Sequence, residues 1–441
     1  MLRQAWTRRV VIALGVTAGA LSVAMGAPSP LLAQVAGAPL PDNVPQTPPP
    51  PAPGTDAALD SARALRGAAL QFTLYTYGPG DEVFERFGHI ALAVSDANTG
   101  EDTAFNWGMF DFDQPNFLGR FLTGDTRYWM AGYRTVEFNA LYQSQNRTIR
   151  RQQLNLTATQ RGALYDFLAW NAQEANRYYR YDYYNDNCST RVRDALDWML
   201  NGALRPALDT VVGYHTWRGE TARITADNLP VYTGIQIALG RNADRPLTRW
   251  QQAFLPDYFA QHLAAVPVAG VRLVAHDTVL FTAQRESMAA AAPQRIMPAR
   301  AAGLGLGVLV FALARLLPVG LSLFGVLWYG VSGVLGTALL LAGTVTKHVP
   351  YMGSNLNLTI LSPLLLLAAA LWWWRARPSR TGRGARALAA LVAGMALVGL
   401  VLMHLPGFTQ GSMLLFMTMV PVHVALAIVA NGRRSPGQPT A

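Results

Sequence analysis

The C-terminal third of the chain constrains the fold most strongly. Beyond Arg300, five stretches are almost free of charge: 301–314, 319–345, 358–374, 387–403 and 413–430. A helix of about 20 apolar residues crosses the hydrocarbon core of a bilayer. The first stretch is short unless Arg315 extends to the membrane surface or its helix runs on towards Pro318. We therefore predict an all-α bundle of five transmembrane helices over residues 301–431, followed by a cytoplasmic tail over 432–441.

The distribution of arginines supports this helix count, because basic residues collect in cytoplasmic loops. If the region before the first helix is exported, two basic clusters fall inside: Arg375, Arg377, Arg380, Arg383 and Arg386 between the third and fourth helices, and Arg433 and Arg434 after the fifth. A single span over 301–345 would place the first cluster outside, so this stretch is predicted to form two helices. The net charge of +10 then reflects membrane topology, and we expect no nucleic-acid partner.

The N-terminal region predicts export. Arg3, Arg8 and Arg9 precede an apolar run over 10–27, and small residues follow it near Ala33. This pattern is typical of a signal peptide or signal anchor, which we assign to residues 1–35. Residues 36–69 contain four consecutive prolines from Pro48 and have the composition of an extended tether. The region after the tether is therefore expected to be exported.

Residues 70–266 have the pattern of a mixed α+β domain. Apolar runs predict strands over 71–77, 89–94 and 103–107. Thr157 and Gln160 have the spacing of a capping box and predict the start of a helix. A second helix is predicted from Cys188, with four residues on its buried face: Val192, Ala195, Leu196 and Met199. Residues 267–300 are expected to connect this domain to the membrane helices.

Cys188 is the single cysteine of the chain, so it forms no internal disulfide and no Cys-rich metal site. At a helix start, unpaired amides and the helix dipole are expected to lower a thiol pKa. His89 stands at the mouth of a predicted strand about a hundred residues earlier and offers a base. The spacing alone is equally consistent with a small buried thiol and a core histidine bonded to a carbonyl.

Three further residues of this domain are candidates for the same site. Asn106, on the next predicted strand, either orients His89 or satisfies a turn. Asn187, with neighbouring amides, either holds an oxyanion or only begins the helix. Arg191 either pairs with a phosphate or bridges to a carboxylate such as Asp194.

The membrane region contributes three more candidates. His348, Asn355 and Asn357 lie in a predicted external loop near the level of lipid headgroups, where they would cover a catalytic groove. The alternative is a loop of ordinary hydrogen-bonding residues. For His404 and His423, a bond to a neighbouring helix is sufficient explanation. Because no HExxH, CxxC, GxGxxG or Walker motif is present, we expect no metal and no cofactor.

Several short motifs together carry a family resemblance. They are Phe87-Gly88-His89, Phe105-Asn106-Trp107-Gly108, Asn146-Arg147, the run 178–194, Phe254-Leu255-Pro256-Asp257, Thr346-Lys347-His348 and Asn355-Leu356-Asn357-Leu358. As a set they resemble the Lnb-type lipoprotein N-acyltransferase family of bacterial envelope proteins. The motifs are spread over most of the chain outside the signal and the tether.

The resemblance implies a permuted papain-like domain, similar to the NlpC and lecithin:retinol acyltransferase groups, in which the histidine strand precedes the cysteine helix. It also implies an enzyme of the inner (cytoplasmic) membrane with its thiol domain in the periplasm. Cys188 would take an acyl chain from a membrane phospholipid as a thioester, with His89 as base and then acid. The acceptor would be the N-terminal amine of a diacylglyceryl-cysteine lipoprotein.

Two other functions remain open from the sequence. A cell-wall amidase or peptidase of NlpC type would share Cys188 and His89, and an open polar groove without apolar lining would favour it. A non-enzymatic membrane scaffold or transporter would instead have Cys188 buried and far from His89.

Overall fold

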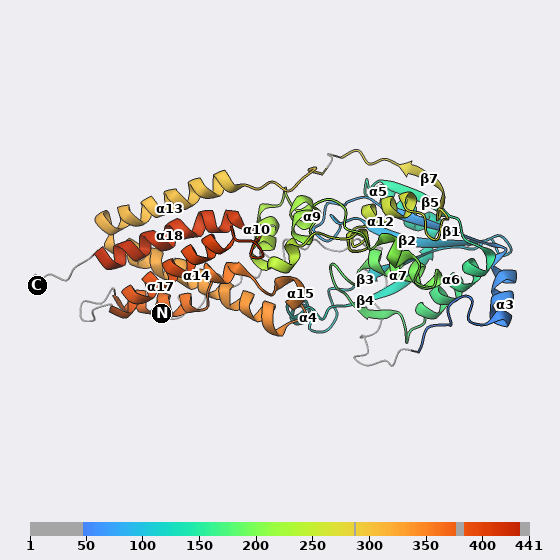
Figure 1. Cartoon of the computed structure of the whole chain (residues 1–441), viewed down its shortest axis with the longest axis horizontal. Coiled ribbons are helices and arrows are strands. Elements are labelled where there is room, and N and C mark those ends of the chain that lie inside the picture. The colour runs from blue at the N-terminus through green and yellow to red at the C-terminus, as the bar shows by residue number, and fades with distance from the viewer. Residues whose placement is uncertain (1–46, 286–287, 376–382, 433–441) are drawn as a thin grey trace, which may run out of the picture. The chain divides into compact units, whose positions relative to one another are not determined.

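The computed structural model describes residues 47–285, 288–375 and 383–432, which form two compact units (Figure 1). Within these residues, unit 1 comprises 47–121, 125–214 and 247–285, and unit 2 comprises 122–124, 215–246 and the described residues from 288 onwards. Several predicted features lie outside the described residues: the signal, Arg377 and Arg380 of the basic loop, and the part of the tail with Arg433 and Arg434.

Unit 1 is built on a seven-stranded antiparallel sheet of order β6-β4-β3-β2-β1-β5-β7. The strands are β1 (Leu70–Tyr77), β2 (His89–Asp96), β3 (Asp102–Met109), β4 (Arg127–Arg134), β5 (Ile149–Leu154), β6 (Tyr178–Arg180) and β7 (Val274–Phe281). The three predicted strands lie within β1, β2 and β3. Side chains alternate between the faces of a strand, and both faces of the central strands are apolar, so this sheet is covered on both sides.

Helices lie on each face of the sheet. On one face, α6 (Ala158–Asn171), α7 (Cys188–Met199) and α12 (Pro256–Ala265) cover a core that includes Phe72, Leu74 and Leu92. On the other face lies α5 (Thr135–Ser144) (Figure 1). Its Phe138 and Tyr142 form a buried cluster with Tyr75 and Tyr77 of β1. The predicted capping box begins α6, and all four residues predicted to be buried on α7 are buried. The α+β class of this domain is therefore confirmed.

Shorter elements complete unit 1, and one of them changes the predicted domain limit. They are α3 (Ala57–Gly67), α8 (Leu204–Leu208), α11 (Arg249–Gln252) and most of α4 (Phe117–Thr123), whose last two residues are assigned to unit 2. Helix α3 packs on α6, with buried Arg63 paired to Asp166 at 3.0 Å, so the extended tether predicted to residue 69 does not include this segment. Strand β7, within the predicted connector, pairs with β5 as an edge strand.

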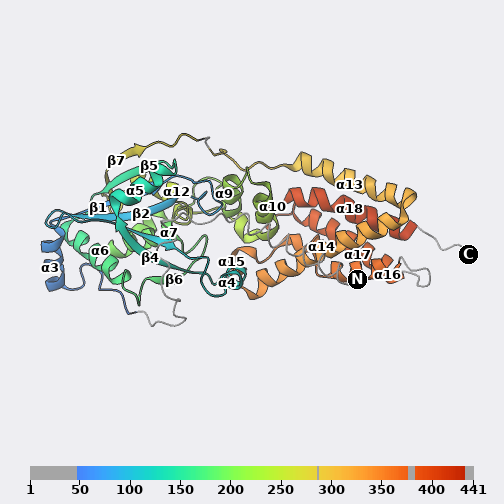
Figure 2. The same cartoon turned by 180° about the vertical axis from the view of Figure 1, so that it is seen from behind.

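Unit 2 contains five long apolar helices that meet the length and composition of membrane spans. They are α13 (Ile296–Leu316), α14 (Pro318–Val345), α16 (Leu364–Arg375), α17 (Arg383–Leu402) and α18 (Met413–Gly432) (Figure 2). The third span is counted from Leu356 through the short helix η2 (Leu356–Thr359). The chain breaks at Leu317, as the two-helix prediction for 301–345 requires, and α13 reaches 21 residues because it starts at Ile296.

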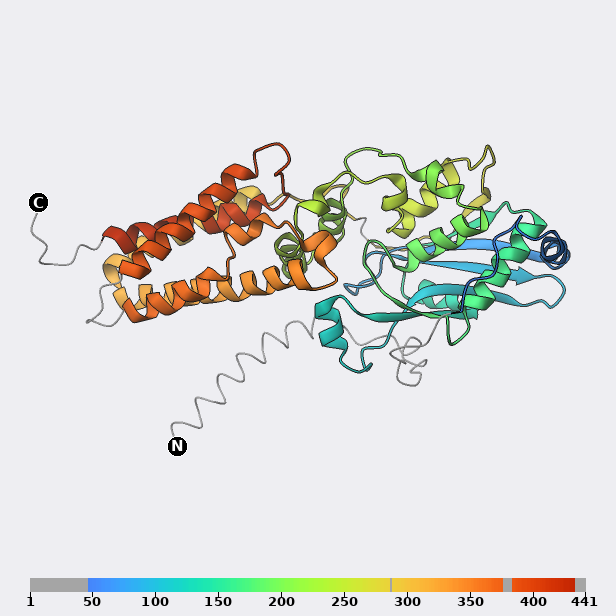
Figure 3. The ribbon, with the colours of Figure 1, turned by 60° about the horizontal axis from the view of Figure 1, so that its bottom comes forward.

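The apolar helices pack in pairs, with α13 and α17 against α18 and α14 against α16 (Figure 3). Unit 2 also includes α9 (Trp217–Ile224), α10 (Leu229–Ala238), η1 (Arg241–Asp244) and α15 (Val349–Met352). The segment 215–246 thus packs with the apolar helices, although its composition placed it inside the domain predicted over 70–266.

Candidate functional site

The thiol stands at a helix start that is fixed by capping. Cys188 is the first residue of α7, and the preceding Asn187 accepts hydrogen bonds from the amides of Ser189 and Thr190 at 2.9 and 3.0 Å. The amide nitrogen of the Asn187 side chain donates to the carbonyls of Tyr183 and Phe254, each at 2.9 Å. Both of its amide hydrogens are therefore engaged, and the geometry gives Asn187 the helix-entry role rather than that of an oxyanion donor.

His89 is the first residue of β2 and lies among aromatic rings. Its imidazole is 5.9 Å from the ring of Tyr142, 6.2 Å from Phe138 and 6.4 Å from Tyr77, measured between centroids. Burial lowers the pKa of His89 to about 4, and the positive charge of Arg147 acts in the same direction. The imidazole is therefore neutral at neutral pH.

Asn106 on β3 fixes the tautomer of His89. The buried Asn106 side chain donates from Nδ2 to the carbonyl of Ala131 at 3.1 Å, which turns its Oδ1 towards His89 Nε2 at 3.2 Å. An oxygen acceptor at that position requires the proton on Nε2, an assignment made from the hydrogen-bond network. Nδ1 of His89 then carries the lone pair of a base. The predicted contact between Asn106 and His89 is present.

Gly108 is the residue between the thiol and the imidazole. A Cβ added to Gly108 would lie 3.5 Å from Cβ of Cys188 and 3.6 Å from Cε1 of His89, so these two atoms are at most about 7 Å apart. Gly108 has φ of +102° and sits where the register of β3 against β4 shifts, as in a β-bulge. The structure thus brings Cys188, His89 and Asn106 to one place, over a glycine.

The two partners approach this glycine from different sides of the sheet. His89, Ala91 and Ala93 are alternate residues of β2 and lie on the same face of the strand, and the two alanines belong to the buried cluster under α5. Cys188 packs instead against the core under α6 and α7. A side chain at position 108 would therefore contact both groups at ordinary van der Waals distance.

The thiol pKa differs from the sequence expectation. Burial raises the pKa of the Cys188 thiol to about 12, while hydrogen bonds from the amides of Ser189 and Ile90 and the charge of Arg147 lower it by less. The helix start thus acts in the predicted direction but desolvation outweighs it. At neutral pH the resting site holds a neutral thiol and a neutral imidazole rather than an ion pair.

This resting state gives a pH prediction. The thiolate fraction of a thiol with a pKa of about 12 rises tenfold with each pH unit below that value. Alkylation of Cys188 by iodoacetamide should therefore accelerate about tenfold per unit from pH 6 to pH 9, without a plateau. A thiolate–imidazolium pair would instead give a flat rate over this range, and a plateau below pH 7 would contradict the neutral pair.

The glycine at 108 gives a second prediction. Gly108→Ala should cost about 1–2 kcal/mol of folding stability because an L-residue is strained at positive φ, and its methyl group should also slow alkylation of Cys188 at pH 8. Gly100→Ala is the matched control, because Gly100 has φ of +75° and no atom within 4 Å of an added Cβ. Both variants should lose stability in thermal melts. Equal alkylation rates for Gly108→Ala and Gly100→Ala would show that a side chain at position 108 does not affect Cys188.

Arg191 takes a different partner from the one considered in the sequence. Its guanidinium makes a two-pronged ion pair with Asp186, with Nη2 2.8 Å from Oδ2, and it lies 4.2 Å from the centre of the Tyr179 ring. The bridge to Asp194 suggested by the sequence is not formed, because Asp194 pairs with Arg193 at 2.8 Å. The charge of Arg191 is thus matched within unit 1 by a carboxylate.

His348, Asn355 and Asn357 all lie buried in unit 2. The backbone carbonyl of His348 accepts the amide bonds that begin α15, and an added Cβ at Gly124 would touch its ring at 3.0 Å. The side chain of Asn355 donates to the carbonyls of Ile237 and Ala238 at 3.1 and 3.0 Å. These residues are brought into packed positions rather than onto an open surface.

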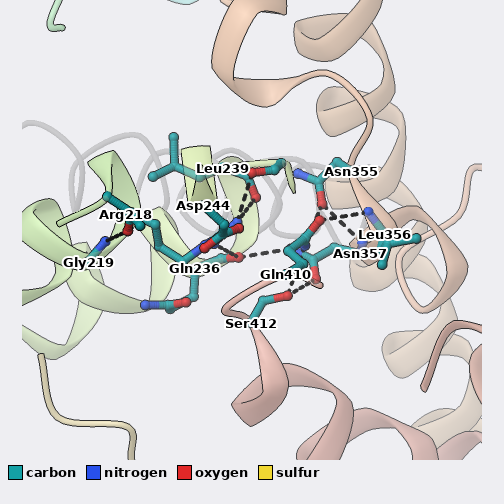
Figure 4. A network of polar contacts seen from close by, with 12 residues as sticks. Arg218, Gly219, Gln236, Leu239, Asp244, Asn355, Leu356, Asn357, Gln410 and Ser412 are labelled. Atoms are coloured by element: carbon teal, nitrogen blue, oxygen red, sulfur yellow. Dashed lines mark hydrogen bonds and ion pairs between the residues drawn. The ribbon is translucent and has the colours of Figure 1, made fainter. Parts of the chain in front are cut away.

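Asn357 completes a polar network at the end of α10 (Figure 4). It donates to the carbonyls of Gln236 and Ile237 at 2.8 and 2.9 Å, and its own oxygen accepts from Ser412 at 2.7 Å. Arg218 donates to three carbonyls of the same helix end: Gln236, Leu239 and Gly240. The last carbonyls of a helix have no partner within it, so both asparagines serve here as helix caps supplied from the loop between α14 and α16.

His404 and His423 both bond to backbone carbonyls. His404 Nδ1 is 2.9 Å from the carbonyl of Leu400, four residues earlier in the chain. His423 is buried and its Nε2 is 3.1 Å from the carbonyl of Ile360. The predicted structural explanation therefore holds for His423, whose partner lies on another element of unit 2.

A set of aromatic side chains beside the thiol was not predicted from the sequence. Successive rings lie 4.1–6.5 Å apart in a closed circuit, which we call the aromatic circuit: Phe110, Phe112, Phe117, Phe121, Tyr183, Tyr181 and Tyr128. Two of them, Tyr128 and Tyr181, are close enough to Cys188 for a thiolate there to raise their pKa, after the larger effect of burial. The density of aromatic residues over 105–133 and 178–184 was the available signal.

Within the residues that the structure describes, unit 1 is thus an α+β domain in which Cys188 and His89 both lie near Gly108, and unit 2 contains five helices of membrane-spanning length. Residues 59–222 match the family model described as the Lnb N-terminal periplasmic domain. The chain therefore contains an Lnb N-terminal periplasmic domain followed by five long apolar helices, as the resemblance implied. Comparison with curated proteins and with solved structures gave no match.

Proposed function

We propose that the chain is a lipoprotein N-acyltransferase of the bacterial inner membrane. It would move an acyl chain from a phospholipid through a thioester at Cys188 to the N-terminal amine of a diacylglyceryl-cysteine lipoprotein. The Lnb domain match supports the family role, and the five apolar helices support a site held at a bilayer. No cofactor enters the proposed reaction.

The meeting of Cys188 and His89 at Gly108, with Asn106 on the far nitrogen of the imidazole, carries this proposal. A thiol beside a base that a third group orients is the arrangement of nucleophilic acyl transfer. The chain order, with the histidine strand before the cysteine helix, is that of a permuted papain-like domain, and we propose this fold relationship for unit 1.

The first half-reaction forms the thioester. Nδ1 of His89 takes the thiol proton as the Cys188 sulfur attacks the ester carbonyl of the phospholipid, and a tetrahedral oxyanion forms. The oxyanion collapses, the ester C–O bond breaks, and the imidazolium returns its proton to the departing alkoxide of the lysophospholipid. Amides near Cys188, which already lower the thiol pKa, are placed to stabilise the negative charge.

The second half-reaction transfers the chain to the amine. An α-amine has a pKa of about 8, so much of it is already neutral near that pH and needs no strong base to become a nucleophile. Its nitrogen attacks the thioester carbonyl, the C–S bond breaks, and an amide and the free thiol of Cys188 result. The proton lost by the amine returns to the sulfur through His89.

The aromatic circuit favours this function over a cell-wall amidase. An amidase would need a polar groove for a glycan-linked peptide, whereas the rings of Tyr128 and Tyr181 give the surroundings of Cys188 an apolar character suited to an acyl chain. A scaffold without chemistry is less well supported, since Cys188 is partly exposed and lies next to His89. We assign His348, Asn355 and Asn357 a supporting role within unit 2.

The test is direct detection of the acyl-enzyme. The purified full chain is incubated with phospholipid vesicles of a single acyl chain, and intact mass spectrometry is then applied. The expected result is an acyl adduct on Cys188 that hydroxylamine removes and that a diacylglyceryl-cysteine peptide discharges as an amide. Cleavage of a cell-wall peptide without any acyl adduct would overturn the proposal in favour of the amidase.

A further inference from the structure

Arg147 is a buried cation next to the site. It lies between α5 and β5, and only 3% of its side chain is exposed. Its Nε donates to the carbonyl of Gly78 at 2.8 Å, and its guanidinium carbon lies 4.5 Å from the centre of the Tyr142 ring. Within the part of the chain that the structure describes, its Nη2 is buried and has no hydrogen-bond partner.

The charge of Arg147 is only partly balanced. Its nearest carboxylate oxygen belongs to Glu85 and is 3.5 Å from Nη1, longer than the roughly 2.7–2.9 Å of a charge-assisted hydrogen bond. A buried arginine is usually held by a close, two-pronged carboxylate. The looser pairing with Glu85 therefore leaves positive potential in a region of low dielectric.

That potential reaches both reacting groups. Arg147 and His89 both pack against the ring of Tyr142. The guanidinium carbon is 4.5 Å and the imidazole centre 5.9 Å from the centre of that ring, so the two groups are roughly 10 Å apart at most. Consistent with this, the charge of Arg147 lowers the pKa of both His89 and Cys188. The tyrosines that face the thiol, which are Tyr128, Tyr142, Tyr179 and Tyr181, stay neutral because burial raises the pKa of each.

We propose that Arg147 is a positioning residue of the site. Its guanidinium is held by Gly78, Glu85 and the Tyr142 ring so that its positive charge stabilises the negative charge that develops on Cys188. Its effect is electrostatic and passes through space. After burial, which has the larger effect, it helps to keep His89 in the neutral form that accepts a proton, and it stabilises the thiolate and the later oxyanion. This inference rests on the proposed acyl transfer for its purpose, but its electrostatic part is measurable without any lipid.

Substitutions of the ion pair separate charge from structure. Arg147→Met removes the cation, while Glu85→Gln removes the group that partly balances it. An electrostatic role predicts that the two variants change the rate of Cys188 alkylation in opposite directions. A role in holding the loop alone predicts a slower alkylation in both. Arg151→Met is the matched control, because Arg151 is an exposed arginine on β5, four residues further along the chain.

The measurements are iodoacetamide alkylation of Cys188 at pH 8 and NMR titration of labelled histidines in the full chain, with His89→Gln identifying the His89 signal. Arg147→Met should slow alkylation about tenfold, equivalent to about one pKa unit, and raise the imidazole pKa. Glu85→Gln should speed alkylation and lower that pKa. Arg147→Lys should stay within about threefold of the parent, and Arg151→Met should match it.

Unchanged rates and an unchanged imidazole pKa in folded Arg147→Met would overturn the proposal. If Arg147→Met fails to fold, a Glu85→Gln variant that slows alkylation would overturn it equally. A parent protein that shows these electrostatic responses yet forms no acyl adduct would instead contradict the acyltransferase function and leave the role of Arg147 standing.

Discussion

Cys188→Ala is expected to abolish N-acylation of lipoproteins in cells that depend on this chain. The nucleophile is lost while the cap of α7 remains, because Asn187 and Thr190 make the capping bonds without the thiol. Alanine is also a favourable helix residue. Removal of a catalytic nucleophile costs at least about 10³-fold in rate, so mass spectrometry of lipoprotein N-termini should find diacylated cysteine with a free amine.

Two checks accompany this experiment. The Cys188→Ala protein should accumulate in the membrane at parental levels and melt within a few degrees of the parent, which excludes loss through misfolding. Cys188→Ser keeps the shape of the side chain but offers a far weaker nucleophile, and should be nearly as inactive. Full N-acylation by Cys188→Ala would end the thiol mechanism.

His89→Ala is expected to produce the second-largest loss, because general base catalysis contributes about 10²- to 10⁴-fold. The rate of thioester formation on Cys188 from phospholipid vesicles is the quantity to follow. Asn106→Ala should lose less, since the imidazole remains but its tautomer is no longer fixed by the 3.2 Å contact. Equal rates of thioester formation for His89→Ala and the parent would remove His89 from the mechanism.

Much of the site was predictable from local pattern. The strand after His89 and the helix after Cys188 follow from apolar runs and from a capping residue, and both elements were found at the predicted positions. The contact of Asn106 with His89 was foreseeable because Asn106 lies on the neighbouring strand of an antiparallel sheet. These inferences depend on neighbours in sequence or on adjacent strands.

Properties set by distant packing were not predictable in the same way. The helix start suggested a lowered thiol pKa, but burial of Cys188 in the folded domain, which depends on tertiary packing, reverses the direction. Gly108 belongs to one of the family motifs, but no local pattern marks it as a site residue, because its place in the site depends on a bulge and on two side chains that lie near it. Arg191 pairs with Asp186 on the preceding turn rather than with Asp194 within its own helix.

The domain limits show the same distinction. Composition located the apolar helices well, since hydrophobicity is a property of each segment by itself. It placed 215–246 with the soluble domain because α9 and α10, of 8 and 10 residues, are too short to resemble membrane helices. Their assignment to unit 2 arises from hydrogen bonds such as those between Asn357 and the end of α10, which no local pattern specifies.

The capped end of α10 also bears on how unit 2 comes apart. Carbonyls at the end of this helix accept hydrogen bonds from Arg218, Asn355 and Asn357, so detaching α10 from the α14–α16 loop would leave several buried acceptors without donors at once. Such a penalty makes partial opening costly and favours concerted unfolding of the two segments. In hydrogen exchange, the amides of α10 and of the loop around Asn357 should thus lose protection together, and a single Asn357→Ala substitution should loosen both.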